Sequence, residues 1–583
     1  MSEYESWSAR RTRLMHRVHA RLAARARAAT AFVSQPEPRT IGSFNRGRQL
    51  IAGNLMFAGH LIEAKGAMLW DLDPPDQAFL EQIHGFGWLD DLAAVGDLRA
   101  RTVAQDWLWG WIDRYGRGSG PGWTPDLTGR RLIRWTHHAI FLLRALEPAQ
   151  SAAYFQSLAH QTRFLGRRWH KAAPGLPRFE ALTGLLYAGL SLSGMERHVG
   201  SATAALAREC AGQIDDQGGI PTRNPEELLE VFTLLTWAAA ALEETGNPVA
   251  PEHQTAITRI APTLRALRHS DGGLARFHGG GRGLDGRLDQ ALSASGVRKG
   301  AQGLAMGFAR LSAGRTSVIV DASPPPEGAA SFNAHASTLA FELTSGRRPL
   351  IVSCGSGAHF GEDWRRAGRA TPSHSTLALE GYSSARLGRE GRVAGARREM
   401  LEDAPEEVPV EIGHASDGLK LEAGHDGYVD THGLTHARIL ELTFDGRGLV
   451  GEDMLLALKS SDRKRFDRVR HAAGKSGIPY HVRFHLHPDV DAEVDMGGMA
   501  VSLALRSGEV WVFRHEGGLE MTLEPSVYLE MGRLRPRATK QIVLSHRAME
   551  YATRIRWSLA KAHDTAVAVR DLTTDDEDYD FDS

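Results

Sequence analysis

The sequence predicts an α+β protein of more than one domain, in which a helical half precedes an antiparallel β-sandwich. Its 583 residues exceed the size at which a single hydrophobic core stops growing, and 42% of them are hydrophobic. Between Asp76 and Arg268, helix-length amphipathic segments alternate with breaks rich in glycine and proline. Beyond Thr316, short strand-like runs separated by turn signals replace them. The order of these patterns predicts two successive layers of structure.

The composition narrows the classes of partner. The formal net charge is −1 at pH 7, which argues against electrostatic binding of nucleic acid by the protein as a whole. No apolar run reaches the roughly 18 residues that a membrane-spanning helix needs, so we expect no transmembrane segment. The two cysteines, Cys210 and Cys354, are too few for a disulfide framework. The sequence leaves the oligomeric state open.

The N-terminal extension, residues 1–50, is predicted to begin with a basic amphipathic helix. Leu14, Val18 and Leu22 are spaced by four and share one helical face, and seven arginines lie between positions 10 and 27. These arginines interrupt every run that could serve as a secretory signal, so we expect a cytoplasmic protein, with the cell envelope or periplasm as the alternative. The helix either packs on the domain as a solvated helix or attaches to an anionic membrane surface.

The helical half, residues 51–303, is predicted to consist of antiparallel helix pairs. Periodicity alone leaves open whether such pairs form an open solenoid or close into an (α/α) toroid. A glycine-dense stretch over residues 270–303 is predicted to be the interdomain loop. The predicted helices span residues 78–95, 98–115, 129–146, 148–167, 178–192, 203–214, 225–243 and 251–267.

The β half, residues 304–565, is predicted to form a large antiparallel sandwich. A Ser345-Gly346 turn between two apolar runs predicts a β-hairpin. The final stretch, residues 566–583, loses this pattern and is acidic, which predicts a disordered tail. The strand-like runs cover residues 317–320, 338–343, 349–352, 377–379, 438–444, 482–487, 510–513 and 541–544.

The stretch from Ser331 to Gly357 resembles the hairpin that opens the C-terminal domain of the heparinase II/III-like polysaccharide lyases. Leu339-Ala-Phe-Glu-Leu343 and Ile351-Val-Ser-Cys-Gly355 occupy the places of its two strands. Downstream, Ser373-His-Ser-Thr376 and Arg483-Phe-His-Leu-His-Pro488 resemble further strands of the family in the right order. The resemblance implies an incomplete (α/α) toroid followed by an antiparallel β-sandwich. It also implies a lyase that cleaves an acidic, uronate-containing polysaccharide by β-elimination, and we expect no required cofactor.

Two places where active lyases of this family carry catalytic residues differ in this chain. Leu176-Pro177 stands in place of an Asn-His pair, so the Asn that would neutralise the uronate carboxylate is missing. Glu227 stands about where a catalytic Tyr would be. These differences leave a second interpretation open, namely a carbohydrate-binding or envelope-assembly protein that keeps the fold and has lost the lyase chemistry. Hydrolysis by paired carboxylates such as Glu180 and Glu227 is the other enzymatic alternative.

β-Elimination needs a base for the C5 proton, an acid for the leaving oxygen and a group that neutralises the carboxylate. His335 lies among small residues that leave room for a ligand, and it is the candidate base. Tyr428 is the candidate acid, and Arg223 or Arg438 is the candidate partner of the carboxylate. We expect further substrate contacts from Asn224, Glu227, Asn333 and Trp135.

The resemblance also implies a structural zinc site. Related lyases bind zinc at the positions of His335 and His374, with an Asp as the third ligand. Ser353 replaces that Asp, and the thiolate of the neighbouring Cys354 is a good zinc ligand, so the candidate metal ligands are His335, His374 and Cys354. A hydrogen-bonded histidine at a strand entrance is the alternative for His335, and a helix N-cap is the alternative for Asn224.

Overall fold

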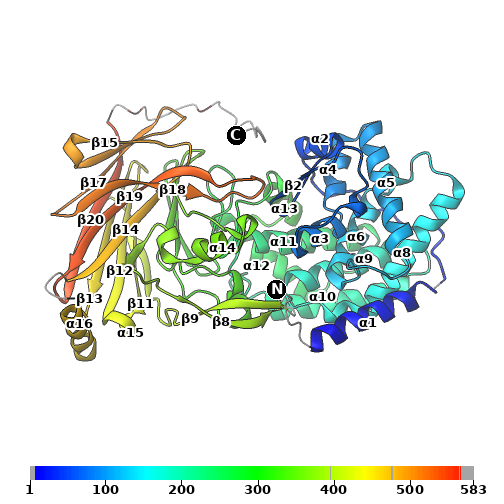
Figure 1. Cartoon of the computed structure of the whole chain (residues 1–583), viewed down its shortest axis with the longest axis horizontal. Coiled ribbons are helices and arrows are strands. Elements are labelled where there is room, and N and C mark those ends of the chain that lie inside the picture. Colours follow the sequence, from blue (N-terminus) through cyan, green and yellow to red (C-terminus); the bar gives the residue numbers. More distant parts are fainter. Residues whose placement is uncertain are drawn as a thin grey trace.

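The computed structural model describes residues 7–25, 27–393, 396–473, 477–563, 565 and 571. In these residues a helical half and a β half lie side by side (Figure 1). The last helix of the helical half is α13 (Arg287–Ser295), and the β-sandwich begins with β3 (Phe308–Ala313). The sequence therefore predicted the order of the two halves correctly.

Most helices of the first half follow the predicted amphipathic segments, but the segment predicted over residues 129–146 forms two helices, over residues 125–137 and 139–143. The segment predicted over residues 78–95 is divided in two at Phe86, whose φ of 60° is left-handed and cannot continue a helix. The helices that precede α13 are α1 (Trp7–Ala23), α2 (Phe44–Ala52), α3 (Gln77–His84), α4 (Trp88–Val95), α5 (Leu98–Tyr115), α6 (Pro125–His137), α7 (Ala139–Leu143), α8 (Pro148–Arg168), α9 (Leu176–Ser191), α10 (Val199–Gln213), α11 (Pro225–Glu244) and α12 (Pro251–Ala266).

Trp135 belongs to the core of this half. Its side chain is fully buried, and its ring stacks on Tyr154 with 5.7 Å between ring centroids. A large aromatic side chain in this position contributes buried apolar area and cannot reach a polymer outside the fold. Trp135 therefore stabilises the helical core in place of the predicted substrate contact.

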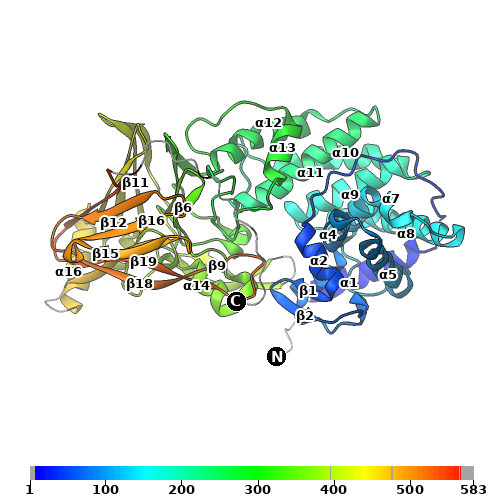
Figure 2. The same cartoon turned by 90° about the horizontal axis from the view of Figure 1, so that it is seen from above.

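A short hairpin at the start of the helical half was not predicted. β1 (Asn54–Phe57) and β2 (His60–Glu63) pair antiparallel around an Ala58-Gly59 turn in which both residues have positive φ. A Cβ on Gly59 would lie 2.3 Å from the carbonyl oxygen of His359, so the tip of the hairpin touches the β half. Figure 2 shows this hairpin at the boundary between the halves.

The β half contains two large antiparallel sheets. One has the strand order β10-β11-β12-β13-β20-β17-β16-β15, and the other has β18-β19-β14-β6-β5-β4-β3, with β7 paired to β14. The strands after β3 are β4 (Thr316–Asp321), β5 (Phe341–Ser345), β6 (Arg348–Val352), β7 (Leu377–Leu379), β8 (Arg386–Val393), β9 (Ala396–Glu402), β10 (Val410–His414), β11 (Gly418–Tyr428), β12 (Leu434–Thr443), β13 (Gly448–Leu456), β14 (Ile478–Leu486), β15 (Asp491–Asp495), β16 (Ala500–Ala504), β17 (Val510–His515), β18 (Glu520–Tyr528), β19 (Arg537–Ala548) and β20 (Ala552–Lys561).

The predicted hairpin around Ser345-Gly346 is present as β5 and β6. Its first strand starts at Phe341, three residues later than predicted, because Leu339 has a φ of 63° and leaves the extended conformation. Phe341 then stacks on Trp557 in the core between the sheets, with 5.7 Å between ring centroids. Of the predicted acidic tail, only Asp571 is described, and it forms an ion pair with Arg348.

Candidate functional site

The candidate site lies at the junction of the two halves, around the glycine-rich loop at residues 277–283. On the helical side this loop contacts the first turn of α11. The backbone N–H of Gly281 donates a 2.7 Å hydrogen bond to Glu226, and a Cβ on Gly280 would lie 2.3 Å from Asn224 Oδ1. Asn224 Oδ1 also accepts the backbone N–H groups of Glu226 and Glu227, at 3.0 and 3.2 Å. Asn224 is therefore the N-cap of α11.

The same loop contacts the segment before β5 on the β side. The backbone N–H of Gly279 donates a 3.0 Å hydrogen bond to His335 Nε2. A Cβ on Gly279 would lie 2.9 Å from the Cβ of Asn333, so the loop and this segment are tightly packed. The loop thus joins the start of α11 to the segment that carries His335.

Arg223 connects the two halves directly. Its guanidinium donates to the carboxylate of Asp321 at 2.6 Å and to the carbonyl oxygen of Pro324 at 2.6 Å. Further bonds reach the carbonyl oxygens of Met306 at 3.1 Å and Gly307 at 3.0 Å. With a fifth bond to the carbonyl oxygen of Ser323 at 3.3 Å, all five N–H donors of the guanidinium are used. In this conformation Arg223 therefore holds the junction together and has no donor left for a uronate.

Asp321 is the centre of a buried polar cluster. Its second oxygen accepts the hydroxyl of Ser337 at 2.7 Å and lies 3.3 Å from His278 Nε2. Burial alone would raise the pKa of Asp321, but Arg223 and His278 outweigh it and hold that pKa well below its ordinary value. Asp321 is therefore a fixed negative charge that organises the groups around it.

His335 and His374 lie against each other in this cluster, with 4.8 Å between ring centroids. Within the described residues, His335 Nδ1 and His374 Nε2 are buried without a hydrogen-bond partner. The other nitrogen of His374 is 3.1 Å from the Ser353 hydroxyl. Burial lowers the pKa of His335 well below its usual range and that of His374 to about 3, so both rings are neutral at pH 7.

The third predicted metal ligand points to other partners. The thiol of Cys354 lies 3.5 Å from His485 Nδ1 and 3.8 Å from the hydroxyl of Ser526. Among the described residues, no group of three or more His, Cys, Asp or Glu side chains is arranged to hold a metal ion. The residues at His335 and His374 thus supply two ligands and do not fit a zinc site built on three protein side chains.

Tyr428 and Arg438 are core residues of the sandwich. The Tyr428 hydroxyl donates to the carbonyl oxygen of Leu377 at 3.1 Å, and burial raises its pKa. Arg438 is fully buried and binds both oxygens of Asp453, at 2.8 and 3.1 Å. Its remaining nitrogen donates to the carbonyl oxygens of Leu339 and Ser375. Neither side chain reaches a surface on which a polysaccharide could bind in this conformation.

The candidate carboxylates are also paired inside the protein. Glu227 accepts the Thr222 hydroxyl at 2.9 Å, and burial raises the pKa of Glu227. Glu180 forms a 2.7 Å ion pair with Arg130, and burial raises the pKa of Glu180 to about 7. The same cause raises the pKa of Glu226 to about 7. Each carboxylate therefore has a structural partner.

Three residues of the candidate site were missed in the sequence. His278 carried a signal, because it stands directly before three glycines that let backbone approach closely. Asp321 ends a strand, and Glu226 follows Pro225 in the first turn of the helix that Asn224 caps. Their roles follow from contacts in the folded protein, namely Asp321 with Arg223 across the junction and Glu226 with Gly281 in the loop.

Comparison with known proteins agrees with this architecture. Residues 296–558 match the family model described as "Heparinase II/III-like, C-terminal". Over 536 residues the chain is 30% identical to FtsZ-localized protein C of Caulobacter vibrioides, covering 90% of this chain and 89% of the relative.

Solved structures are similar over nearly the whole chain. The crystal structure of heparinase III has a TM-score of 0.65 at 12% identity, covering 93% of this chain and 88% of that one. The heparan sulfate lyase HepC of Pedobacter heparinus has a TM-score of 0.54 at 14% identity, covering 94% and 88%. At these identities the likeness concerns the fold, and it confirms the predicted toroid followed by a sandwich.

Proposed function

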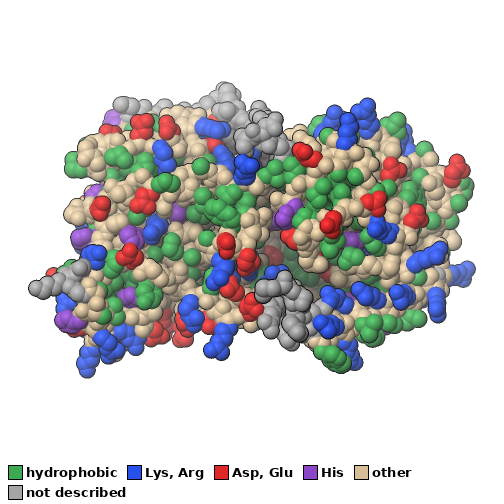
Figure 3. Space-filling model, viewed as in Figure 1, with side chains coloured by type: hydrophobic (Ala, Val, Ile, Leu, Met, Phe, Trp, Pro, Cys, Tyr) green, Lys and Arg blue, Asp and Glu red, His purple; other side chains and the backbone are tan. Residues whose placement is uncertain are grey.

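Because the chain belongs to the heparinase II/III-like family, we propose that it binds an acidic, uronate-containing polysaccharide across the junction of its two halves. The fold is that of solved polysaccharide lyases over nearly the full length of the chain. The surface is hollowed where the two halves meet (Figure 3). A groove between domains suits a polymer, because the polymer can extend beyond both ends of the groove.

The four candidate catalytic side chains are buried or paired inside the protein, which favours binding of the polysaccharide over its cleavage. His335 and Tyr428 are buried, and the donors of Arg223 and Arg438 are occupied by protein groups. A base, an acid or a carboxylate partner acts only when it reaches the sugar. We therefore infer that the protein binds its polysaccharide without efficient β-elimination.

Cleavage by β-elimination is the second candidate, and one observation favours it. His335 is neutral at pH 7, and its Nδ1 has no partner among the described residues. A neutral imidazole is able to accept the C5 proton of a uronate if the loop around Gly279 moves aside.

One experiment separates the two candidates. The protein is titrated with a panel of uronate polysaccharides in a calorimeter, and the same samples are read for the ultraviolet absorbance of an unsaturated uronate. Saturable binding without absorbance is the expected result. Product formation that disappears in His335→Ala, but persists in an equally folded His485→Ala, would establish the lyase. Absence of both binding and product would refute the proposal as a whole.

We further infer that α1 attaches the protein to an anionic membrane surface. Its exposed face carries Trp7, Leu14 and Leu22, which are 76%, 59% and 45% exposed, whereas His16 and Ala20 on the other face are buried. Lys and Arg side chains line the edge of the helical half where α1 lies (Figures 1 and 3). Apolar side chains flanked by arginines suit the boundary between headgroups and acyl chains. No helix among the described residues is long and apolar enough to cross a membrane.

The relative from Caulobacter vibrioides is named for its localisation with FtsZ, and we propose the same location for this chain.

Co-sedimentation with anionic and neutral vesicles tests the proposed attachment of α1 to a membrane. The affinity of the double variant Leu14→Ser/Leu22→Ser for anionic vesicles should be about tenfold or more lower than that of the wild type. Leu98→Ser is the matched control, because Leu98 is 67% exposed on a different helix. Equal losses in both variants, or unchanged binding in the double variant, would contradict the role of α1.

A further inference from the structure

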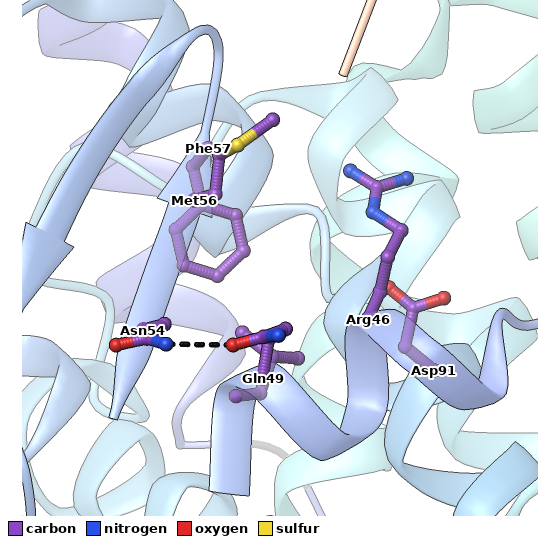
Figure 4. A pocket seen from close by; sticks show the side chains of 7 residues that line it. Arg46, Gln49, Asn54, Met56, Phe57 and Asp91 are labelled. Carbon is purple, nitrogen blue, oxygen red and sulfur yellow. Dashed lines mark hydrogen bonds between the residues drawn. The ribbon is translucent and has the colours of Figure 1, made fainter. Parts of the chain in front are cut away.

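A pocket lies on the helical half, between α2, β1 and α4 (Figure 4). No function described above uses this pocket. Its empty volume, which includes the open mouth, is about 410 Å³. Three apolar side chains and four polar ones line it, namely Leu50, Met56, Phe57, Arg46, Gln49, Asn54 and Asp91.

Arg46 is the feature that points to a ligand. Its guanidinium extends from α2 into the space beside the hairpin strand (Figure 4). Within the described part of the chain, that guanidinium has no hydrogen bond or ion pair. The nearby carboxylate of Asp91 instead accepts the backbone N–H of Ser43 at 2.8 Å. The positive charge of Arg46 acts on the Asp91 carboxylate, but the planar donors of the guanidinium make no hydrogen bond within the described residues and can take a bound group.

The two amides of the pocket are held in place by each other. Asn54 Nδ2 donates a 2.6 Å hydrogen bond to Gln49 Oε1. Among the residues that the structure describes, Asn54 Oδ1 and Gln49 Nε2 make no further hydrogen bond, so an acceptor and a donor remain on neighbouring elements. Together with Asp91, the pocket therefore offers acceptors and donors next to an apolar wall.

We propose that this pocket binds one acidic sugar residue of a polysaccharide. The carboxylate of the sugar pairs with Arg46 in a bidentate manner. The hydroxyls of the sugar donate to Asp91 and Asn54 and accept from Gln49. Its C–H face packs on the apolar wall, as sugar rings do on aromatic and aliphatic side chains. A neutral sugar would leave Arg46 without its anion.

The position of the pocket suits a polymer that also occupies the junction. β1 forms one wall of the pocket and continues directly into the hairpin turn. That turn touches the β half at His359. A chain bound between the halves can therefore reach the pocket with a neighbouring residue. The glycan class in this inference rests on the proposed function, whereas the location rests on the pocket alone.

The methyl group of Met56 reports on the pocket independently of any polymer. In the full chain labelled with ¹³C-methyl methionine, the Met56 signal is assigned by its loss in Met56→Leu. Titration with glucuronate should shift this signal saturably, and titration with glucose should shift it much less. Equal shifts with both sugars would overturn the specificity for an acid. No shift with glucuronate at tens of millimolar would overturn the site.

Arg46→Met and Arg48→Met then connect the pocket to the polymer. Loss of a charge-assisted pair in Arg46→Met should weaken binding of a uronate polysaccharide by about ten- to a hundredfold. Arg48, exposed on the same helix, is the matched control and should leave affinity unchanged. Polymer binding that is equal in all three proteins would refute this inference and leave the proposed function standing. A wild-type protein that binds glucuronate at Met56 but no polymer would refute the proposed function alone.

Discussion

Arg223→Lys tests whether this arginine binds substrate or holds the junction. The structure gives its guanidinium one carboxylate and four carbonyl acceptors, on Asp321, Met306, Gly307, Ser323 and Pro324. A lysine ammonium has three protons and no planar fork, so it can serve Asp321 and at most two of the carbonyls. At least two of these partly buried carbonyls would therefore lose their partner.

The size of the effect follows from these lost bonds. A hydrogen bond to a charged group contributes about 1.5–3 kcal/mol, and water can reach part of this site because the Arg223 side chain is 11% exposed. Loss of two such bonds should lower the free energy of unfolding by about 2–4 kcal/mol. The stacking of the guanidinium over Phe308, at 4.7 Å, would weaken as well.

Urea unfolding followed by circular dichroism measures this change, with Arg259→Lys as the control. Arg259 pairs with Asp216 at 2.8 Å, but Asp216 is 93% exposed, so this pair contributes about 0–1 kcal/mol. If Arg223→Lys unfolds within about 0.5 kcal/mol of the wild type while glycan affinity falls, Arg223 binds substrate as the sequence suggested. That result would refute the structural role argued here.

Three further measurements test other parts of the structure. Arg438→Met should destabilise the protein by about 3–5 kcal/mol, because it leaves the buried carboxylate of Asp453 without its arginine, whereas Arg554→Met on the surface should change little in the same urea assay. For His374, the folded-state pKa of about 3 lies below the ordinary 6.5, so the unfolded chain binds a proton that the folded chain does not between these values. Stability should therefore fall as the pH drops from about 6.5 towards 3, and His374→Asn should reduce this slope by up to about 1.4 kcal/mol per pH unit, measured by urea unfolding across that range; an unchanged slope would contradict the neutral buried ring. Of the three predicted zinc ligands the structure brings together two, His335 and His374, and no group of three suitable side chains is arranged for a metal ion among the described residues, so elemental analysis should find no stoichiometric zinc and EDTA should leave the melting temperature unchanged. One zinc per chain that is lost in His374→Ala would contradict this.

The helical half was predictable because its signals are local. The helix predicted over residues 98–115 has the same bounds as α5. Asp97 caps its first turn by accepting the backbone N–H of Ala100 at 2.7 Å, and Gly116 follows its last residue. The hairpin β1–β2 was missed because strands of four residues give too short an alternation to distinguish from a loop.

The site was only partly predictable because the sequence identifies residue types but not their partners. A lone arginine near a helix start fits a substrate contact and an interdomain clamp equally well. Asp321 decides between these roles for Arg223, and the two residues are 98 positions apart in the chain. Arg438 is 15 positions from Asp453, but only the pairing of β12 with β13 places the two side by side. Contacts of this range depend on the finished fold.

The buried junction and the changed motifs support the same interpretation. The family resemblance implies that Leu176-Pro177 and Glu227 stand where active lyases carry an Asn-His pair and a Tyr. Glu227 bonds to Thr222 within the protein. A polar side chain that must stay available for a sugar lowers the stability of the fold if it is buried without a hydrogen-bond partner. A side chain that no longer takes part in catalysis can instead form hydrogen bonds inside the protein. The pairing of Arg223 with Asp321 is therefore what loss of the elimination chemistry would permit. The polysaccharide binding proposed above does not depend on these groups, because the proposed site for the acidic sugar is the Arg46 pocket, elsewhere on the same fold.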